Sequence, residues 1–71
     1  MDMQEWIYEA RWQALCAADR PNPTGDDAWN GFDNLRSMIA NAPSMPDWEV
    51  AEIEAAYVDA ACAAFGRDYF R

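Results

Sequence analysis

Histidine and lysine are both absent from this chain of 71 residues, and glycine occurs only three times. Histidine is the usual group that gains and loses protons near neutral pH, and lysine is a common alternative base, so hydrolytic and transfer chemistry lack their ordinary reagents. The chain also has no glycine-rich phosphate loop and no D-x-D-x-D-G calcium loop. We therefore expect a protein that binds a partner without a cofactor, and not an enzyme.

Cysteine is nearly as scarce, since Cys16 and Cys62 are the only two. Without histidine and without a C-x-x-C pair, a structural zinc site is not expected. Both cysteines stand in alanine-rich helical patterns, and no signal peptide precedes them, so we expect a reduced cytoplasmic protein in which they serve as small apolar fillers. A disulfide or a reactive thiol is the alternative.

Long apolar runs are missing too. The longest, residues 60–65, is mostly alanine and is far shorter than the roughly 18 residues that a membrane span requires, so we expect a soluble chain. What the chain has in excess is negative charge: 13 carboxylates against five arginines give a net charge of -8. This charge opposes direct contact with nucleic acid or an anionic membrane and favours a protein partner with a basic surface.

The first helical pattern covers residues 3–18. Asp2 with Glu5 three residues later is a typical start signal for a helix. At about 100° per residue, the pattern is amphipathic. The residues expected on its apolar face are Met3, Ile7, Ala10, Ala14, Leu15 and Ala18.

A stretch rich in proline and glycine ends the first pattern, and a second helix is predicted over residues 28–40. Asp26 or Asp27 is the expected N-cap, and Asn41 with Pro43 ends the helix. The residues expected on its apolar face are Ala28, Trp29, Phe32, Leu35 and Ile39.

The third and longest helix is predicted over residues 45–65, with Ser44 and Asp47 as a capping pair and Gly66 as the stop. The residues expected on its apolar face are Val50, Ile53, Tyr57, Ala60, Ala61 and Ala64. No segment shows the alternating pattern of a strand. The sequence therefore predicts an all-α, compact three-helix arrangement, with residues 1–71 as a single domain.

Carboxylates collect on the predicted outer faces of two helices: Glu5 and Glu9 on the first, and Glu49, Glu52 and Asp59 on the third. The ordinary interpretation is a solvated surface that keeps a small protein in solution. The functional interpretation is phosphate mimicry, in which the carboxylates occupy a basic groove built for nucleic acid. Both interpretations stay open at this point.

Aromatic residues are numerous, with four tryptophans, three tyrosines and three phenylalanines. So small a core cannot enclose all of them, and tryptophan is a frequent interface anchor. Trp12 and Trp48 are our candidates for contacts with a partner or in a homodimer; the alternative is that they cover the edge of the core.

Two charged residues interrupt the apolar faces: Glu54 in the third helix and Arg11 in the first. We expect Arg11 or Arg36 to pair with Glu54 at the margin of the core, where the pair would set the helix register. A role in an interface is the alternative. If the pair forms, replacing Glu54 with leucine is expected to lower the thermal stability.

In size, acidity and lack of catalytic residues, the whole chain resembles in type the small proteins that phages and mobile elements encode against host machinery, including anti-CRISPR proteins and DNA mimics. The resemblance implies an inhibitor or adaptor in the host cytoplasm and transfers no site residues. The competing hypothesis is an accessory subunit held in a homo- or hetero-oligomer by an apolar helix face. The candidate partner-binding residues are Glu5, Glu9, Trp12, Trp48, Glu49, Glu52 and Asp59.

Overall fold

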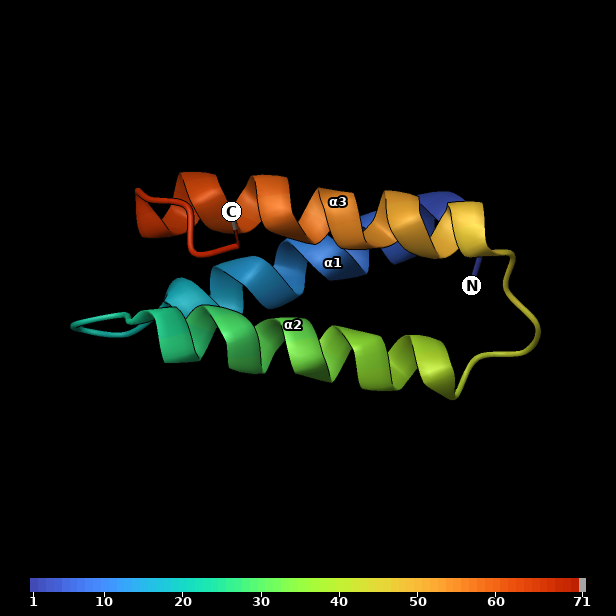
Figure 1. Ribbon diagram of the computed structural model, residues 1–71, viewed down its shortest axis with the longest axis horizontal. Helices are drawn as coiled ribbons and strands as arrows, with labels where there is room; N and C mark the ends of the chain where they lie inside the picture. The colour runs from blue at the N-terminus through green and yellow to red at the C-terminus, as the bar shows by residue number, and fades with distance from the viewer. Residues whose placement is uncertain (71) are drawn as a thin grey trace.

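The computed structural model describes residues 1–70, and most of them lie in three α-helices. Their order is α1 (Met3–Ala18), α2 (Gly25–Ala40) and α3 (Asp47–Phe65). In Figure 1, α2 and α3 run in opposite directions along the long axis, and α1 crosses obliquely between them. α1 makes most of the contacts with both other helices, whereas α2 and α3 touch each other least. The predicted all-α, three-helix architecture is confirmed. Arg71, the last residue of the predicted domain, lies outside the described residues.

α1 begins where the sequence predicts. Asp2 Oδ1 accepts a hydrogen bond of 2.9 Å from the backbone N–H of Glu5, which satisfies a helix-end donor that would otherwise lack a partner. The apolar face, however, differs from the prediction: the buried residues are Trp6, Ala10 and Ala14, and Leu15 is 54% exposed. Leu15 directly follows Ala14 and therefore points about 100° away from the stripe at i, i+4 and i+8.

α2 begins at Gly25, earlier than predicted, and its N-cap is Thr24. Thr24 Oγ1 accepts from the N–H of Asp27 at 3.4 Å, and Asp27 Oδ2 accepts from the N–H of Thr24 at 2.9 Å. The prediction of Asp26 or Asp27 as the N-cap is therefore wrong, because this reciprocal capping box extends the helix through the glycine. A Cβ on Gly25 would lie 2.9 Å from Tyr69 Cδ1, so this glycine leaves room for a ring.

α3 begins at Asp47, and the predicted side-chain cap from Ser44 does not form. Pro46 is the N-cap, with an extended ψ of 148°. Proline also disfavours helical geometry in the residue before it, so the helix cannot start at Met45 as predicted. At the other end, Gly66 has φ 73° and its N–H donates to Cys62 O at 3.1 Å. The predicted stop at Gly66 is confirmed.

The centre of the core is Tyr57, which is fully buried together with Leu35 and Ile53. Tyr57 Oη donates a hydrogen bond of 2.6 Å to the backbone carbonyl of Ala28. Burial raises the pKa of Tyr57 to about 12, because the anion would lose its hydration. A Cβ on Gly31 would overlap Tyr57 Oη and lie 2.9 Å from Ala17 Cβ of α1, so glycine at this position leaves room for the tyrosine hydroxyl and for the packing of α2 on α1.

The C-terminal tail completes the core. In Figure 1 it turns back from the end of α3 towards α2. The ring of Phe70 lies 4.6 Å from that of Trp29, 5.5 Å from Phe32 and 5.9 Å from Tyr57, measured between centroids. We call these four residues the aromatic cluster. It fills the space between α2 and α3, which otherwise make few contacts.

The predicted ion pair at the margin of the core forms with Arg36, whose Nε lies 3.5 Å from Glu54 Oε2. The side chain of Arg36 is 62% exposed, and Arg11 is also exposed. Cys16 and Cys62 are not joined by a disulfide. Cys16 is exposed, so the expectation that it fills the core is wrong. Across residues 1–70, no helix is long and apolar enough to cross a membrane.

Candidate partner-binding surface

The outer side of α3 carries three of the predicted partner-binding residues. Trp48 is 64% exposed, and Glu52 and Asp59 are exposed as well. Their spacings of four and seven residues place them along one face of the helix. The buried residues Ile53, Tyr57 and Ala61 occupy the opposite face. The structure therefore gathers one tryptophan and two carboxylates on a surface with no part in the core.

α1 contributes a second exposed stripe, which contains the predicted residues Glu5 and Trp12. Trp12 is 53% exposed, Tyr8 70% and Leu15 54%. Sequence reasoning missed Tyr8 and misassigned Leu15, although the spacing of residues 8, 12 and 15 was a usable signal for a shared face. Trp12 and Leu15 border Ala64 of α3 in a shallow depression. The stripe on α1 thus continues onto α3.

Two predicted residues lie away from these outer faces. Glu9 is partly buried, and its Oε1 accepts from Gln13 Nε2 at 3.0 Å. The same Nε2 lies 3.8 Å from Met38 Sδ of α2, which places Glu9 towards α2. Glu49 is partly buried and lines a cavity between the helices. The predicted carboxylates therefore fall into two groups: Glu9 and Glu49 are partly buried, and the others lie on the exposed outer faces.

The carboxylates of the outer faces are available for a partner. Within residues 1–70, no ion pair involves Glu5, Glu52 or Asp59, whereas Asp27 pairs with Arg20 at 3.3 Å and Glu54 with Arg36. The chain carries a net charge of -8, so its field attracts basic groups from beyond direct contact. Exposed aromatic rings beside these carboxylates can bury large rigid areas once contact is made.

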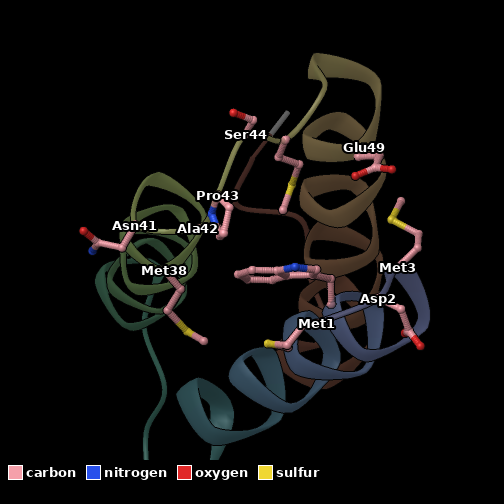
Figure 2. Close-up of a pocket in the computed structure, with 11 residues that line it drawn as sticks. Met1, Asp2, Met3, Met38, Asn41, Ala42, Pro43, Ser44 and Glu49 are labelled. Atoms are coloured by element: carbon pink, nitrogen blue, oxygen red, sulfur yellow. The ribbon is translucent and has the colours of Figure 1, made fainter.

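A large cavity lies at the end of the molecule where α1 and α3 begin and α2 ends. It has a volume of about 830 Å³, and its walls include Trp6, Glu49 and part of the connection between α2 and α3. Figure 2 shows that its polar groups come from different segments of the chain: Asn41 follows the end of α2, and Glu49 belongs to α3. We call it the methionine cavity because all four methionines of the chain, Met1, Met3, Met38 and Met45, line it.

Among the described residues, no group of three cysteine or acidic side chains is placed to hold a metal ion. Comparison of the chain with protein-family models, with curated proteins and with solved structures finds no match. The candidate surface therefore has to be interpreted from its own chemistry.

Proposed function

We propose that this protein is a small acidic inhibitor or adaptor, and not an enzyme, that docks on the basic surface of a protein partner. The observation that carries the proposal is the exposed face of α3, where Trp48 stands in line with Glu52 and Asp59. The stripe of Tyr8, Trp12 and Leu15 on α1 adds apolar area beside Glu5.

The two kinds of side chain have different tasks in such a complex. Burial of a tryptophan side chain removes about 150–250 Å² of surface from water, and apolar area contributes roughly 25 cal/mol per Å². Carboxylates add little net affinity after desolvation, but they speed association and exclude acidic partners. Affinity should therefore depend on Trp48, whereas association rate and salt dependence should follow Glu52 and Asp59.

The partner class that best fits this chemistry is a protein that itself binds nucleic acid. Such a protein offers lysines and arginines spaced to contact phosphates, and an acidic helix face can occupy those contacts. The protein would then act as an anti-defence protein of the anti-CRISPR type, encoded by a phage or mobile element and working in the host cytoplasm. It would contact neither nucleic acid nor membrane directly.

A pulldown from a bacterial lysate, with captured proteins identified by mass, tests the proposal. It is run at about 50 mM and about 500 mM sodium chloride, because exposed charges are screened at high salt. The test variant is Glu52→Arg/Asp59→Arg. The matched control is Asp26→Arg/Asp33→Arg, which changes the net charge equally, at the same spacing of seven residues, on exposed positions of α2.

Capture of a nucleic-acid-binding protein that is lost at high salt and in the α3 variant, but kept in the α2 control, supports the proposal. Equal loss in both variants would mean that net charge alone drives capture. Capture by neither the native protein nor the α2 control, at either salt concentration, contradicts the proposal.

The second candidate is an accessory subunit, and the exposed apolar stripe of α1 favours it. Tyr8, Trp12 and Leu15 lie on one face, and such a face is typical of helix-helix interfaces. The chain could pair with itself or with a larger assembly through this stripe. Light scattering that shows a dimer at both salt concentrations, and a monomer for Trp12→Ala, would favour this candidate.

A further inference from the structure

The methionine cavity is built from flexible side chains around one fixed ring. Trp6 is only 7% exposed and belongs to the core, so this wall of the cavity is rigid. Met3, Met38 and Met45 are partly buried against that core, and Met1 is 64% exposed. In Figure 2, the side chains of Met1 and Met38 point towards one another from different segments of the chain.

Methionine has an unbranched, polarizable side chain that adapts to apolar groups of different shape, and surfaces rich in methionine bind varied apolar segments. A volume of about 830 Å³ lies within the range of about 300–1,000 Å³ that is typical of ligand-binding pockets. All four methionines of the chain lie here and none lies elsewhere. The cavity can therefore receive more than one large apolar side chain.

The charge around the cavity selects among apolar ligands. Asp2 and Glu49 line it, and no arginine does. The net charge of -8 adds a long-range preference for basic ligands. The cavity thus combines apolar, adaptable walls with carboxylates at its edge.

We propose that the methionine cavity is a binding site for a basic amphipathic helix of a protein partner. Large apolar side chains of that helix enter between the methionines and against Trp6, and flanking lysines or arginines meet Asp2 and Glu49. This mode of recognition places apolar anchors at helical spacing in a groove. The site is separate from the outer face of Trp48, Glu52 and Asp59, so the inference goes beyond the proposed function.

Methionine labelling gives a direct test, because every methionine of the chain lines the cavity. The protein is labelled with ¹³C at the methionine methyl groups and titrated with a synthetic amphipathic helix of leucine and lysine of about 18 residues. The expected result is saturable movement of the methyl signals, including those of Met38 and Met45. Binding of the peptide without movement of these signals, or no binding, would overturn the proposal.

Two further peptides distinguish the contribution of the apolar anchors to affinity from that of the charge. A peptide with alanine in place of leucine keeps the lysines, and one with glutamate in place of lysine keeps the leucines. Both should bind at least about tenfold more weakly than the first peptide at about 150 mM salt. If the alanine peptide binds as well as the leucine peptide, charge alone is responsible and the cavity has no role.

A filled cavity completes the test. Ala42 lines the cavity, and Ala42→Phe should weaken the leucine-lysine peptide about tenfold or more. The control is Ala63→Phe, the same change at an exposed position near the C-terminal end of α3, far along the helix from Glu49, which should leave binding within about twofold. Glu49→Gln, a milder change, should weaken binding without altering the fold. Unchanged affinity in both cavity variants would contradict the proposal.

The same titration distinguishes this site from the proposed outer surface. Glu52→Arg/Asp59→Arg should weaken the peptide no more than Asp26→Arg/Asp33→Arg does, because both change only the long-range field at the cavity. If the α3 variant alone abolishes binding, the peptide sits on the outer face, and the cavity proposal fails while the proposed function survives.

Discussion

The space between α2 and α3 is filled by aromatic rings at one end of the molecule and left open at the other end. α2 and α3 make few contacts with one another, and the space between them has to be filled. At one end the tail returns and Phe70 packs against Trp29, Phe32 and Tyr57. At the other end, residues 41–46 form an extended connection from α2 to α3 (Figure 1). No aromatic ring from the described part of the tail fills the space there, and the methionine cavity stays open.

The difference lies in the side chains that each end uses. The aromatic cluster consists of rigid rings, with Tyr57 and Phe70 at an interplanar angle of 90° and a centroid distance of 5.9 Å; such edge-to-face pairs add about 0.5–1.5 kcal/mol beyond area burial. The methionine cavity uses side chains with three rotatable bonds, which specify no single packing. From this difference we expect stability to depend more on the aromatic end, and adaptability to a ligand to lie at the methionine end.

Gly31→Ala should have the largest effect on the stability of the aromatic end. A Cβ at this position would overlap Tyr57 Oη and lie 2.9 Å from Ala17 Cβ, so α2 would be pushed from both neighbours. We expect a loss of about 3 kcal/mol in the free energy of unfolding despite the better helix propensity of alanine. Urea unfolding followed by circular dichroism measures it; a more stable variant would show that α2 can shift without cost.

Alkaline pH should lower the free energy of unfolding through Tyr57, which belongs to the aromatic cluster. Tyr57 has an ordinary pKa of 10.0 and a pKa of about 12 in the folded protein. The raised pKa means that stability is intact below pH 10 and falls as pH rises towards 12, by up to about 2–3 kcal/mol. Unfolding free energies measured from pH 9 to pH 12 should show this slope, and Tyr57→Phe should reduce it. An equal slope in the variant would assign it to other groups.

Phe70→Ala should open the aromatic end. The ring is partly buried and touches three others, so we expect a loss of about 2 kcal/mol, less than for a fully buried phenylalanine. Trp29 would lose its nearest ring, and its fluorescence should shift to longer wavelength. Stability equal to that of the native protein would mean that the tail does not hold α2 and α3 together.

Met38→Ala should have a smaller effect, because it enlarges a cavity that is already open. We expect a loss of about 1 kcal/mol or less, below the roughly 2–5 kcal/mol of methionine-to-alanine changes in a core, because Met38 is only partly buried. The losses in the free energy of unfolding are measured for Met38→Ala and Phe70→Ala under the same conditions. Their difference expresses the contrast between the two ends as a single number. A loss as large as that of Phe70→Ala would remove the contrast.

Glu54→Leu should change stability least. The sequence alone predicts a lower thermal stability, but the side chain of Arg36 is 62% exposed and that of Glu54 29%, so the arginine stays hydrated without its partner. Exposed pairs contribute about 0–1 kcal/mol, and we expect a change of less than about 0.5 kcal/mol in thermal unfolding. A larger loss would show that the pair specifies the register of α2 on α3.

Features with a local cause could be predicted from the sequence. The cap at Asp2 depends on a residue three positions away, and the stop at Gly66 depends on its own positive φ of 73°. The start of α2 was missed although its signal is local. Thr24 and Asp27 form a complete capping box, but prolines and a glycine around them favour a loop in any sequence-based interpretation.

Features that depend on packing could not be predicted. In an alanine-rich helix the apolar stripe has little contrast, so the sequence places Leu15, which is exposed, on the apolar face of α1 and leaves out Trp6, which is buried. Of the candidate surface, the exposure of Trp12 and Trp48 was predictable because the core is small. The position of Glu49 beside the cavity was not, because it depends on how far α2 diverges from α3.

The position of Phe70 in the sequence has a consequence for biosynthesis. The ribosome releases α1, α2 and α3 in order, but the ring that packs between α2 and α3 comes after all three helices. Until residue 70 has left the exit tunnel, Trp29 and Phe32 lack a neighbour that their final packing requires. The nascent chain therefore presents an incomplete core, exposed to chaperones and proteases, until this last aromatic residue has emerged.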